Sequence, residues 1–183
     1  TARESLLRWR GLIHAAIHGR KSGNALSSAL ADVARRREIP TRLLDAVMDG
    51  CEMDTRKTRY RTFAELREYC WHVASAVGLS SLHIFGVDGK DAQTYAENLG
   101  LALQMTNIIR DAATDIARDR VYIPLEDIRA RGLSEAEFVR LVRAESRDAR
   151  AVAKFRDLVA FEGERAMGFF RAARAAHERI EAG

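Results

Sequence analysis

The chain has 183 residues, and 47% of them are hydrophobic, which is enough for one domain with a sizeable core. Two cysteines, Cys51 and Cys70, are too few for a disulfide framework and favour a reducing compartment, the cytoplasm. No apolar run reaches the length of about 18 residues that a membrane span needs, and the net charge of +4 suits anionic substrates or an acidic membrane surface. No nucleic-acid-binding motif accompanies the arginines, so we expect no nucleic-acid partner.

Apolar residues recur every three or four positions along the first part of the chain, as in amphipathic helices. The pattern predicts a helix that ends near Gly19, a turn-rich connector at 19–24 and a second helix that runs into the arginines at 35–37. A third helix begins at Pro40. One face of it carries three carboxylates, which we interpret as a polar helix end rather than a second metal site: Asp45, Asp49 and Glu52.

A capping box of Thr62 and Glu65 predicts the start of the next helix. Its predicted core stripe consists of Phe63, Leu66, Cys70, Val73 and Val77. Small residues at 74–76, together with Gly78, predict a close approach of a neighbouring helix. A loop at 86–91 follows, in which Asp91 is the expected N-cap of a long helix.

The last third of the chain is expected to be helical as well. Residues 118–124 break the pattern, Gly132 ends a short helix, and Ser134 with Glu137 forms another capping box. A long structural helix is predicted from Arg147 onward.

The long helix contains the most informative stretch, Gln104–Pro124. At about 100° per residue its apolar positions form an ordinary core-facing stripe. The opposite side gathers amides, arginines and two carboxylates: Gln104, Asn107, Arg110, Asp111, Asp115 and Arg118.

Two carboxylates one helical turn apart repel unless a positive charge lies near them, because their Cβ atoms are only about 6 Å apart. Mg²⁺ is a natural candidate, since it is commonly held by one or two carboxylates and the phosphates of a substrate. The arginines suit diphosphate oxygens. A solvated helix face of mixed charge explains the spacing of Asp111 and Asp115 equally well, because DxxxD is frequent by chance.

The complete string NxxRDxxxDxxxxRxYxP resembles the second aspartate-rich motif of the squalene/phytoene synthase family; it consists of Asn107, Arg110, Asp111, Asp115, Arg120, Tyr122 and Pro124, and Gln104 also fits. Residues 69–86, YCWHVASAVGLSSLHIFG, are similar to the family's YCxxVAxxVG segment. Within the family, this segment looks most like bacterial presqualene diphosphate synthases of the hopanoid pathway.

The resemblance implies an all-α, single-domain, isoprenoid-synthase-type helical bundle around a central cavity, spanning 1–183. It implies a Mg²⁺-dependent prenyltransferase that joins two farnesyl diphosphates head to head to presqualene diphosphate. Phytoene synthase, which uses two geranylgeranyl diphosphates, is the near alternative. A non-catalytic helical assembly factor with the same fold is the alternative from another class.

The resemblance also implies roles for individual residues. The metal ligands would be Asp111 and Asp115, assisted by Asn107. Contacts with the substrate diphosphate would come from Gln104, Asn107, Arg110, Arg118, Arg120 and Tyr122, with Arg110 and Tyr122 catalytic. The residues expected to line the cavity are Tyr69, His72, Val73 and Ala76.

Two departures from the family pattern qualify these expectations. Some members carry a catalytic tyrosine where this chain has Trp71 and His72, so that role is not carried over. The family's first DxxxD motif, upstream of the segment around Trp9, and its last helices are not recognised here. We therefore expect a fragment that is poorly active alone, from a cytoplasmic protein for which peripheral contact with the inner membrane face stays open.

Overall fold

The structure is a computed structural model that describes residues 1–20 and 24–182, and within these ranges its regular elements are helices, with one isolated β-bridge between Arg59 and Val121. The predicted connector at 19–24 includes residues 21–23, which lie outside the described ranges. The helices are α1 (Ala2–Ile17), α2 (Ala25–Arg36), α3 (Thr41–Arg56), α4 (Phe63–Cys70), the π-helical segment η1 (Trp71–Ser75), α5 (Ala76–Phe85), α6 (Lys90–Ala117), α7 (Leu125–Ala130), α8 (Glu135–Val142) and α9 (Ala149–Ala182). The expectation of an all-α fold is confirmed.

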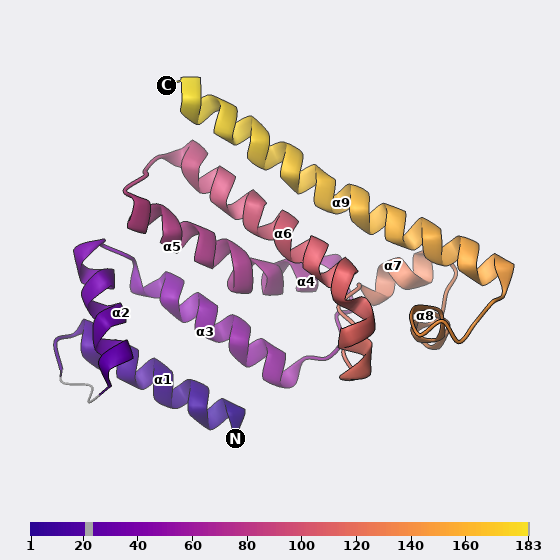
Figure 1. Ribbon diagram of the computed structural model, residues 1–183, viewed down its shortest axis with the longest axis horizontal. Coiled ribbons are helices and arrows are strands. Elements are labelled where there is room, and N and C mark those ends of the chain that lie inside the picture. The colour runs from indigo at the N-terminus through magenta and orange to yellow at the C-terminus, as the bar shows by residue number, and fades with distance from the viewer. Residues whose placement is uncertain (21–23, 183) are drawn as a thin grey trace.

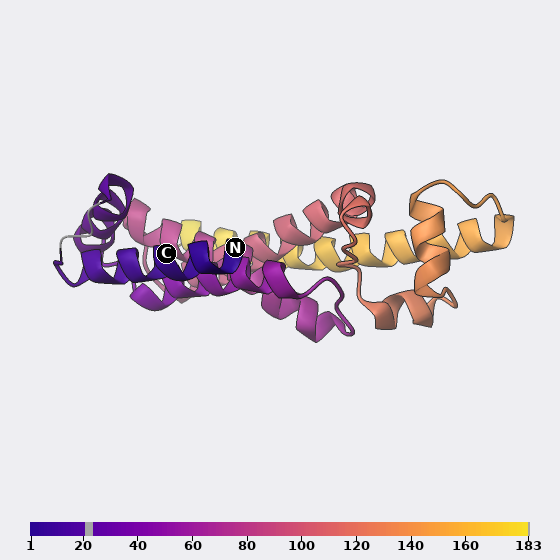
Figure 2. The ribbon, with the colours of Figure 1, turned by 90° about the horizontal axis from the view of Figure 1, so that it is seen from below.

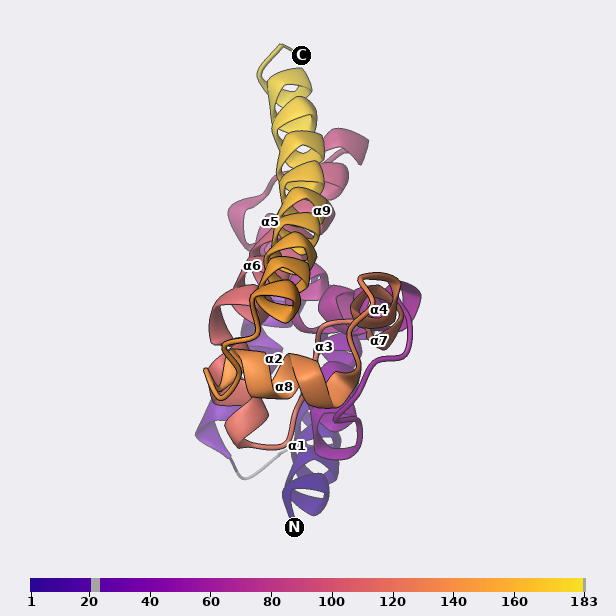
Figure 3. The same ribbon diagram turned by 90° about the vertical axis from the view of Figure 1, so that its right-hand side faces the viewer.

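The longer helices lie side by side in one elongated layer, in the order α9, α6, α5, α3 and α1 (Figure 1). Helix α2 packs on α1 at one end of the layer. Figure 2 shows how thin the layer is compared with its length. Helices α7 and α8 gather at the opposite end, close to the beginning of α9 (Figure 3). Each interior helix therefore has neighbours on two sides and two further faces above and below the layer.

The helix starts only partly follow the sequence-based expectations. The Ser134–Glu137 capping box is present with both of its hydrogen bonds. At α4 the Thr62 side chain accepts from the Glu65 backbone N–H at 3.3 Å, but the Glu65 carboxylate accepts from Arg61 N–H instead, so only half of the box forms. The prediction that Asp91 caps α6 is wrong, because Gly89 occupies that position; Asp91 lies in the first turn.

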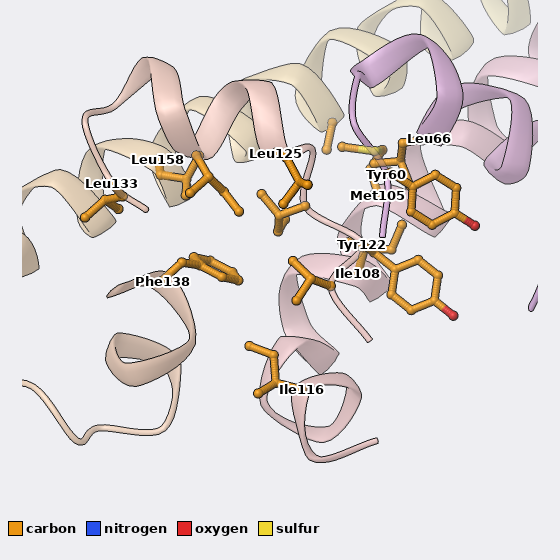
Figure 4. Close-up of a cluster of buried hydrophobic side chains, with 14 of the residues drawn as sticks. Tyr60, Leu66, Met105, Ile108, Ile116, Tyr122, Leu125, Leu133, Phe138 and Leu158 are labelled. Carbon is orange, nitrogen blue, oxygen red and sulfur yellow. The ribbon is translucent and has the colours of Figure 1, made fainter. Parts of the chain in front are cut away.

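The main core lies between α6, α9, α4 and the segments that precede α7 and α8. Figure 4 shows its aliphatic side chains, with Tyr60 and Tyr122 at one edge and their hydroxyl groups pointing away from the cluster. Large side chains that are almost fully buried here include Tyr60, Leu66, Met105, Ile128 and Leu158.

The π-helical segment η1 changes the predicted core stripe of the α4–α5 helix. A π turn inserts one residue, and this rotates everything after it relative to an α-helical pattern. Leu66 and Cys70, which precede the insertion, are buried as predicted, but Val77, which follows it, is exposed. Ser75 and Ala76 take the buried positions in its place.

Glycines set the distance between η1, α5 and their neighbours. A Cβ at Gly100 of α6 would lie 2.7 Å from the backbone nitrogen of Ser75, and one at Gly78 would lie 3.0 Å from the carbonyl oxygen of Ala96. The predicted close helix approach at Gly78 is therefore present. The contact at Gly100, which the sequence pattern did not predict, is tighter than the one at Gly78.

The three carboxylates on one face of α3 hold helix α1 in place. His14 pairs with Asp45 at 2.7 Å, Arg3 pairs with Glu52 at 3.2 Å, and Arg10 pairs with Asp49. These contacts agree with the interpretation of the three carboxylates as structural.

Candidate active site

The polar stripe of α6 faces outward along the second half of the helix. Gln104, Asn107, Asp111 and Asp115 are half-buried, whereas Arg110 is exposed. The Arg110 guanidinium donates two hydrogen bonds to the Asp111 carboxylate, at 2.8 and 2.7 Å. The predicted alignment of amides and carboxylates along one helix face is thus present, with one of the two carboxylates already paired.

The second carboxylate, Asp115, is not paired in this way. Burial is the main cause that raises its pKa, and the neighbouring Asp111 charge raises it further. Arg120 and Arg118 lower the pKa, and Asp54 raises it again. The net shift is upward, so the charged form of Asp115 is under-compensated by the surrounding protein groups. An additional positive charge at this point would stabilise it.

The chain after α6 turns back and runs beside the segment before α4. The Val121 N–H donates to the Thr58 carbonyl and the Leu125 N–H donates to the Tyr60 carbonyl, both at 2.9 Å. This pairing of extended segments brings Tyr60 and Tyr122 together, with ring centroids 5.6 Å apart.

Asp54, at the end of α3, is the centre of a polar cluster that the sequence did not indicate as part of the site. Its carboxylate accepts from the Tyr122 hydroxyl at 2.7 Å and from the Tyr69 hydroxyl at 3.0 Å. Arg120 donates to the Asp54 carbonyl at 3.0 Å and to the Tyr122 hydroxyl oxygen at 3.3 Å. Asp54 follows Asp45, Asp49 and Glu52 on the same helix, and the sequence-based interpretation of that helix considered only those three.

The three tyrosines stay protonated near neutral pH. Burial raises the pKa of Tyr122 to about 12, and the Asp54 carboxylate contributes in the same direction. Burial also raises the pKa values of Tyr69 and Tyr60. Tyr122 and Tyr69 are therefore hydrogen-bond donors with protons directed at Asp54, and the buried Tyr60 hydroxyl has no hydrogen-bond partner among the described residues.

An apolar groove of about 490 Å³ runs between α6 and the η1–α5 segment and leads to the polar stripe. Its lining is formed almost entirely by small and aliphatic side chains, with Phe85 and Tyr95 near the α5–α6 loop and with Gln104 and Asn107 toward the carboxylates. The close approach at Gly78 and Gly100 forms its floor. A hydrophobic chain lying in the groove would place a charged head group beside Asn107 and Asp111.

The four residues expected to line the cavity are separated by the structure. Val73 lines the groove. Ala76 is completely buried, Tyr69 points to Asp54, and the His72 ring lies 3.1 Å from the Ala46 carbonyl oxygen through Nδ1. These three do not line the groove, because the π insertion and the packing on α3 turn them away from it.

The predicted diphosphate contacts also divide into two groups. Gln104 and Asn107 line the groove, and Arg118 is exposed at the end of α6. Arg120 and Tyr122 instead face Asp54. With Asp115 they border a cavity of about 10 Å³, which is close to the least volume that holds one water molecule and far too small for a substrate.

The residues present fit a magnesium ion that is shared with a substrate. Among the described residues no group of three or more His, Cys, Asp or Glu side chains gathers around one point. Asp111 and Asp115 nevertheless supply two carboxylates on one face, and Mg²⁺ is usually held by one or two carboxylates together with substrate phosphates and water.

Comparison with known proteins defines first the class of fold. The structure superimposes on the crystal structure of the squalene synthase HpnC from Alicyclobacillus acidocaldarius with a TM-score of 0.84 at 24% identity, covering 96% of this chain and 64% of that one. A dehydrosqualene synthase gives a TM-score of 0.68 at 22% identity and covers 96% of this chain and 66% of that one. The chain therefore has the all-α fold of isoprenoid synthases.

The sequence matches the squalene/phytoene synthase family over residues 1–183, and the chain belongs to this family. It is 38% identical to the phytoene synthase of Pseudescherichia vulneris over 75% of this chain and 44% of the relative. It is 34% identical to the chloroplastic phytoene synthase 3 of Zea mays, over 92% of this chain and 39% of the relative. The chain thus spans less than half the length of these two curated relatives.

Proposed function

We propose that this chain forms the prenyl-diphosphate-binding core of an enzyme that joins two prenyl diphosphates head to head. The observation that carries the proposal is that an apolar groove and a pair of carboxylates follow one another along α6. An apolar groove with a lining suited to a hydrocarbon chain ends at Gln104 and Asn107, and the next two helical turns present Asp111 and Asp115. An amphiphile with an anionic head group matches this sequence of surfaces if a cation such as Mg²⁺ bridges the head group and the two carboxylates.

Each polar residue has a proposed task in this reaction. Asp111 and Asp115, with the Asn107 carbonyl oxygen, would hold Mg²⁺, which supplies positive charge to the departing diphosphate when it is bound. Arg110 and Arg118 would hold diphosphate oxygens, since both are exposed on the stripe. Gln104 would donate a hydrogen bond to the diphosphate from the end of the groove.

The proposed chemistry needs charge stabilisation and the exclusion of water more than it needs a base. The C–O bond of the first allylic diphosphate breaks, and the leaving diphosphate takes the bonding electron pair. The double bond of the second molecule attacks the allylic cation, and the released diphosphate takes up the proton whose loss closes the cyclopropylcarbinyl diphosphate. Arg110 would stabilise the leaving group. Tyr122, which donates a hydrogen bond to Asp54 and accepts one from Arg120, would hold these two groups in position beside Asp115.

Farnesyl diphosphate is the substrate that we propose, with presqualene diphosphate as the product. The curated relatives quoted above are named phytoene synthases, which makes two geranylgeranyl diphosphates the specific alternative. We further propose a cytoplasmic protein that touches a membrane surface, because the exposed apolar side chain of Phe85 lies at one end of the groove. Among residues 1–20 and 24–182, no helix has the length and apolarity to cross a bilayer. Co-sedimentation with anionic vesicles tests the membrane contact, and a protein that stays in the supernatant contradicts it.

Titration calorimetry with farnesyl thiolodiphosphate, with and without Mg²⁺, tests the proposed function on this chain. We expect Mg²⁺-dependent binding that Asp115→Asn weakens at least tenfold, which corresponds to about 1.4 kcal/mol. Asp88→Asn is the matched control, because Asp88 lies exposed in the α5–α6 loop, away from the stripe. Binding that ignores both Mg²⁺ and Asp115→Asn would contradict the proposal and favour a non-catalytic helical protein.

A further inference from the structure

The end of the groove that lies farthest from the carboxylates is formed by two aromatic residues. Helices α5 and α6 are joined by the short loop 86–89 and therefore run antiparallel (Figure 1). Phe85, the last residue of α5, and Tyr95, in the second turn of α6, consequently both lie toward the loop end. Gln104 and Asn107 lie at the other end. Any chain whose head group is held at Asn107 has its tail pointing at Tyr95 and Phe85.

The usable length of the groove follows from helix geometry. Its α6 wall extends from Tyr95 to Asn107, and at 1.5 Å per residue this stretch is about 18 Å long. Between Tyr95 and Gln104 this wall is made of small or aliphatic side chains, so Tyr95 is the first aromatic residue on the wall that a chain extending from Asn107 meets. The position of Tyr95 therefore defines a limit to the length of the chain.

The two aromatic side chains differ in how firmly they are held. The Tyr95 ring packs on the His177 ring of α9, with centroids 5.5 Å apart. Phe85 is 76% exposed, which is the largest value among the exposed large hydrophobic side chains in the described part of the chain. A ring in contact with another helix forms a fixed wall, whereas a ring with so little packing can change its rotamer at low cost.

We propose that Tyr95 is the end wall that sets the length of the prenyl chain accepted by the groove, with Phe85 as a movable side chain beside it. The inference rests on the proposed function and deepens it, because it identifies what selects between fifteen- and twenty-carbon substrates. His177 is a positioning residue that keeps the Tyr95 ring in place.

The test is calorimetric binding of geranyl, farnesyl and geranylgeranyl thiolodiphosphates to the 183-residue chain in the presence of Mg²⁺. Tyr95→Ala removes the end wall of the groove. We expect the affinity for the geranylgeranyl probe, relative to that for the farnesyl probe, to improve by at least about tenfold. A single methylene in an apolar pocket already changes selectivity by about 10- to 200-fold. Phe85→Ala should change the same ratio less, because its ring is mostly in solvent. Ile84→Ala is the matched control: Ile84 precedes Phe85 and is 41% exposed, but does not line the groove.

A second variant should shorten the prenyl chain that the groove accepts, and it leaves the packed Tyr95 ring in place. Ser81 lines the groove between its two ends, and Ser81→Phe should weaken binding of the geranylgeranyl and farnesyl probes more than binding of the geranyl probe. A Tyr95→Ala ratio that stays within twofold of wild type, with binding retained, overturns the inference alone, and a changed ratio in Ser81→Phe then shows that the probes still lie in the groove. A wild-type chain that binds none of the three probes overturns the proposed function and the inference with it.

Discussion

The two halves of α6 are built on opposite principles. From Tyr95 to Leu103 the helix packs closely on η1 and α5 through glycine and alanine, and what remains above this contact is an apolar groove. From Asn107 to Asp115 the same helix carries charges, and its surroundings are fixed by hydrogen bonds to Asp54 and by the extended pairing of 58–61 with 121–126. The first half depends on shape, and the second depends on polar partners. A binding site for an amphiphile requires both on one rigid element.

The most severe way to break the groove half is Gly100→Ala. Its Cβ would lie 2.7 Å from the Ser75 backbone nitrogen, so the backbone of η1 would have to shift. We expect a loss of about 2–3 kcal/mol in the free energy of unfolding, as is typical of overpacked cores, measured by urea denaturation.

Gly163→Ala is the matched control for this prediction. Gly163 lies within α9, and nothing lies within 4 Å of its would-be Cβ. Alanine should therefore stabilise the helix by about 0.5–1 kcal/mol. Equal effects of the two substitutions would show that the close approach of α6 and η1 does not matter for stability.

The polar half should respond to pH, because charged groups are buried beneath it. Glu162 of α9 is fully buried beside Ile109 and Ala112 of α6, and Arg165 bridges it to Asp127. Burial raises the pKa of Glu162 to about 7, well above its ordinary value. A raised carboxyl pKa means that the folded state holds its proton more tightly than the unfolded state. The contribution to stability is therefore complete at acid pH and is lost as pH rises through about 4.5 to 7.

Glu162→Gln removes this titration. We expect the wild type to lose up to about 3 kcal/mol relative to the variant between pH 4.5 and pH 8. Chemical denaturation of both proteins across this range measures the difference. Parallel pH profiles of the two proteins would contradict the raised pKa.

The smallest expected effect distinguishes the tyrosines of the Asp54 cluster. Tyr122→Phe removes the donor that lies 2.7 Å from the Asp54 carboxylate, and we expect a loss of about 1–2 kcal/mol in the free energy of unfolding. Tyr60→Phe is the control, because the Tyr60 hydroxyl is buried without a hydrogen-bond partner in the described ranges. That substitution should be neutral or stabilising. If the free energy of unfolding falls equally in both variants, the hydrogen bonds to Asp54 do not stabilise the surroundings of the polar half of α6.

Most helices of this protein are predictable from the sequence, since helix formation is governed by local spacing and capping. The stripe from Gln104 to Asp115 is also predictable, because positions three and four residues apart always share a helix face. The π insertion at 71–75 is not, because nothing in the local pattern marks the extra residue. The burial of Ala76 and the exposure of Val77 follow from it.

By itself, the sequence determined the helical class, the polar stripe on α6 and the family motifs that carry the resemblance. Only the tertiary structure decided that Asp54 meets Tyr69, Tyr122 and Arg120, and that a groove leads from Phe85 and Tyr95 to Asn107. The physical reason is the separation of the contacting residues along the sequence. Periodicity relates residues within a few helical turns, whereas these contacts join positions up to 68 residues apart and depend on how closely the glycines let the helices pack.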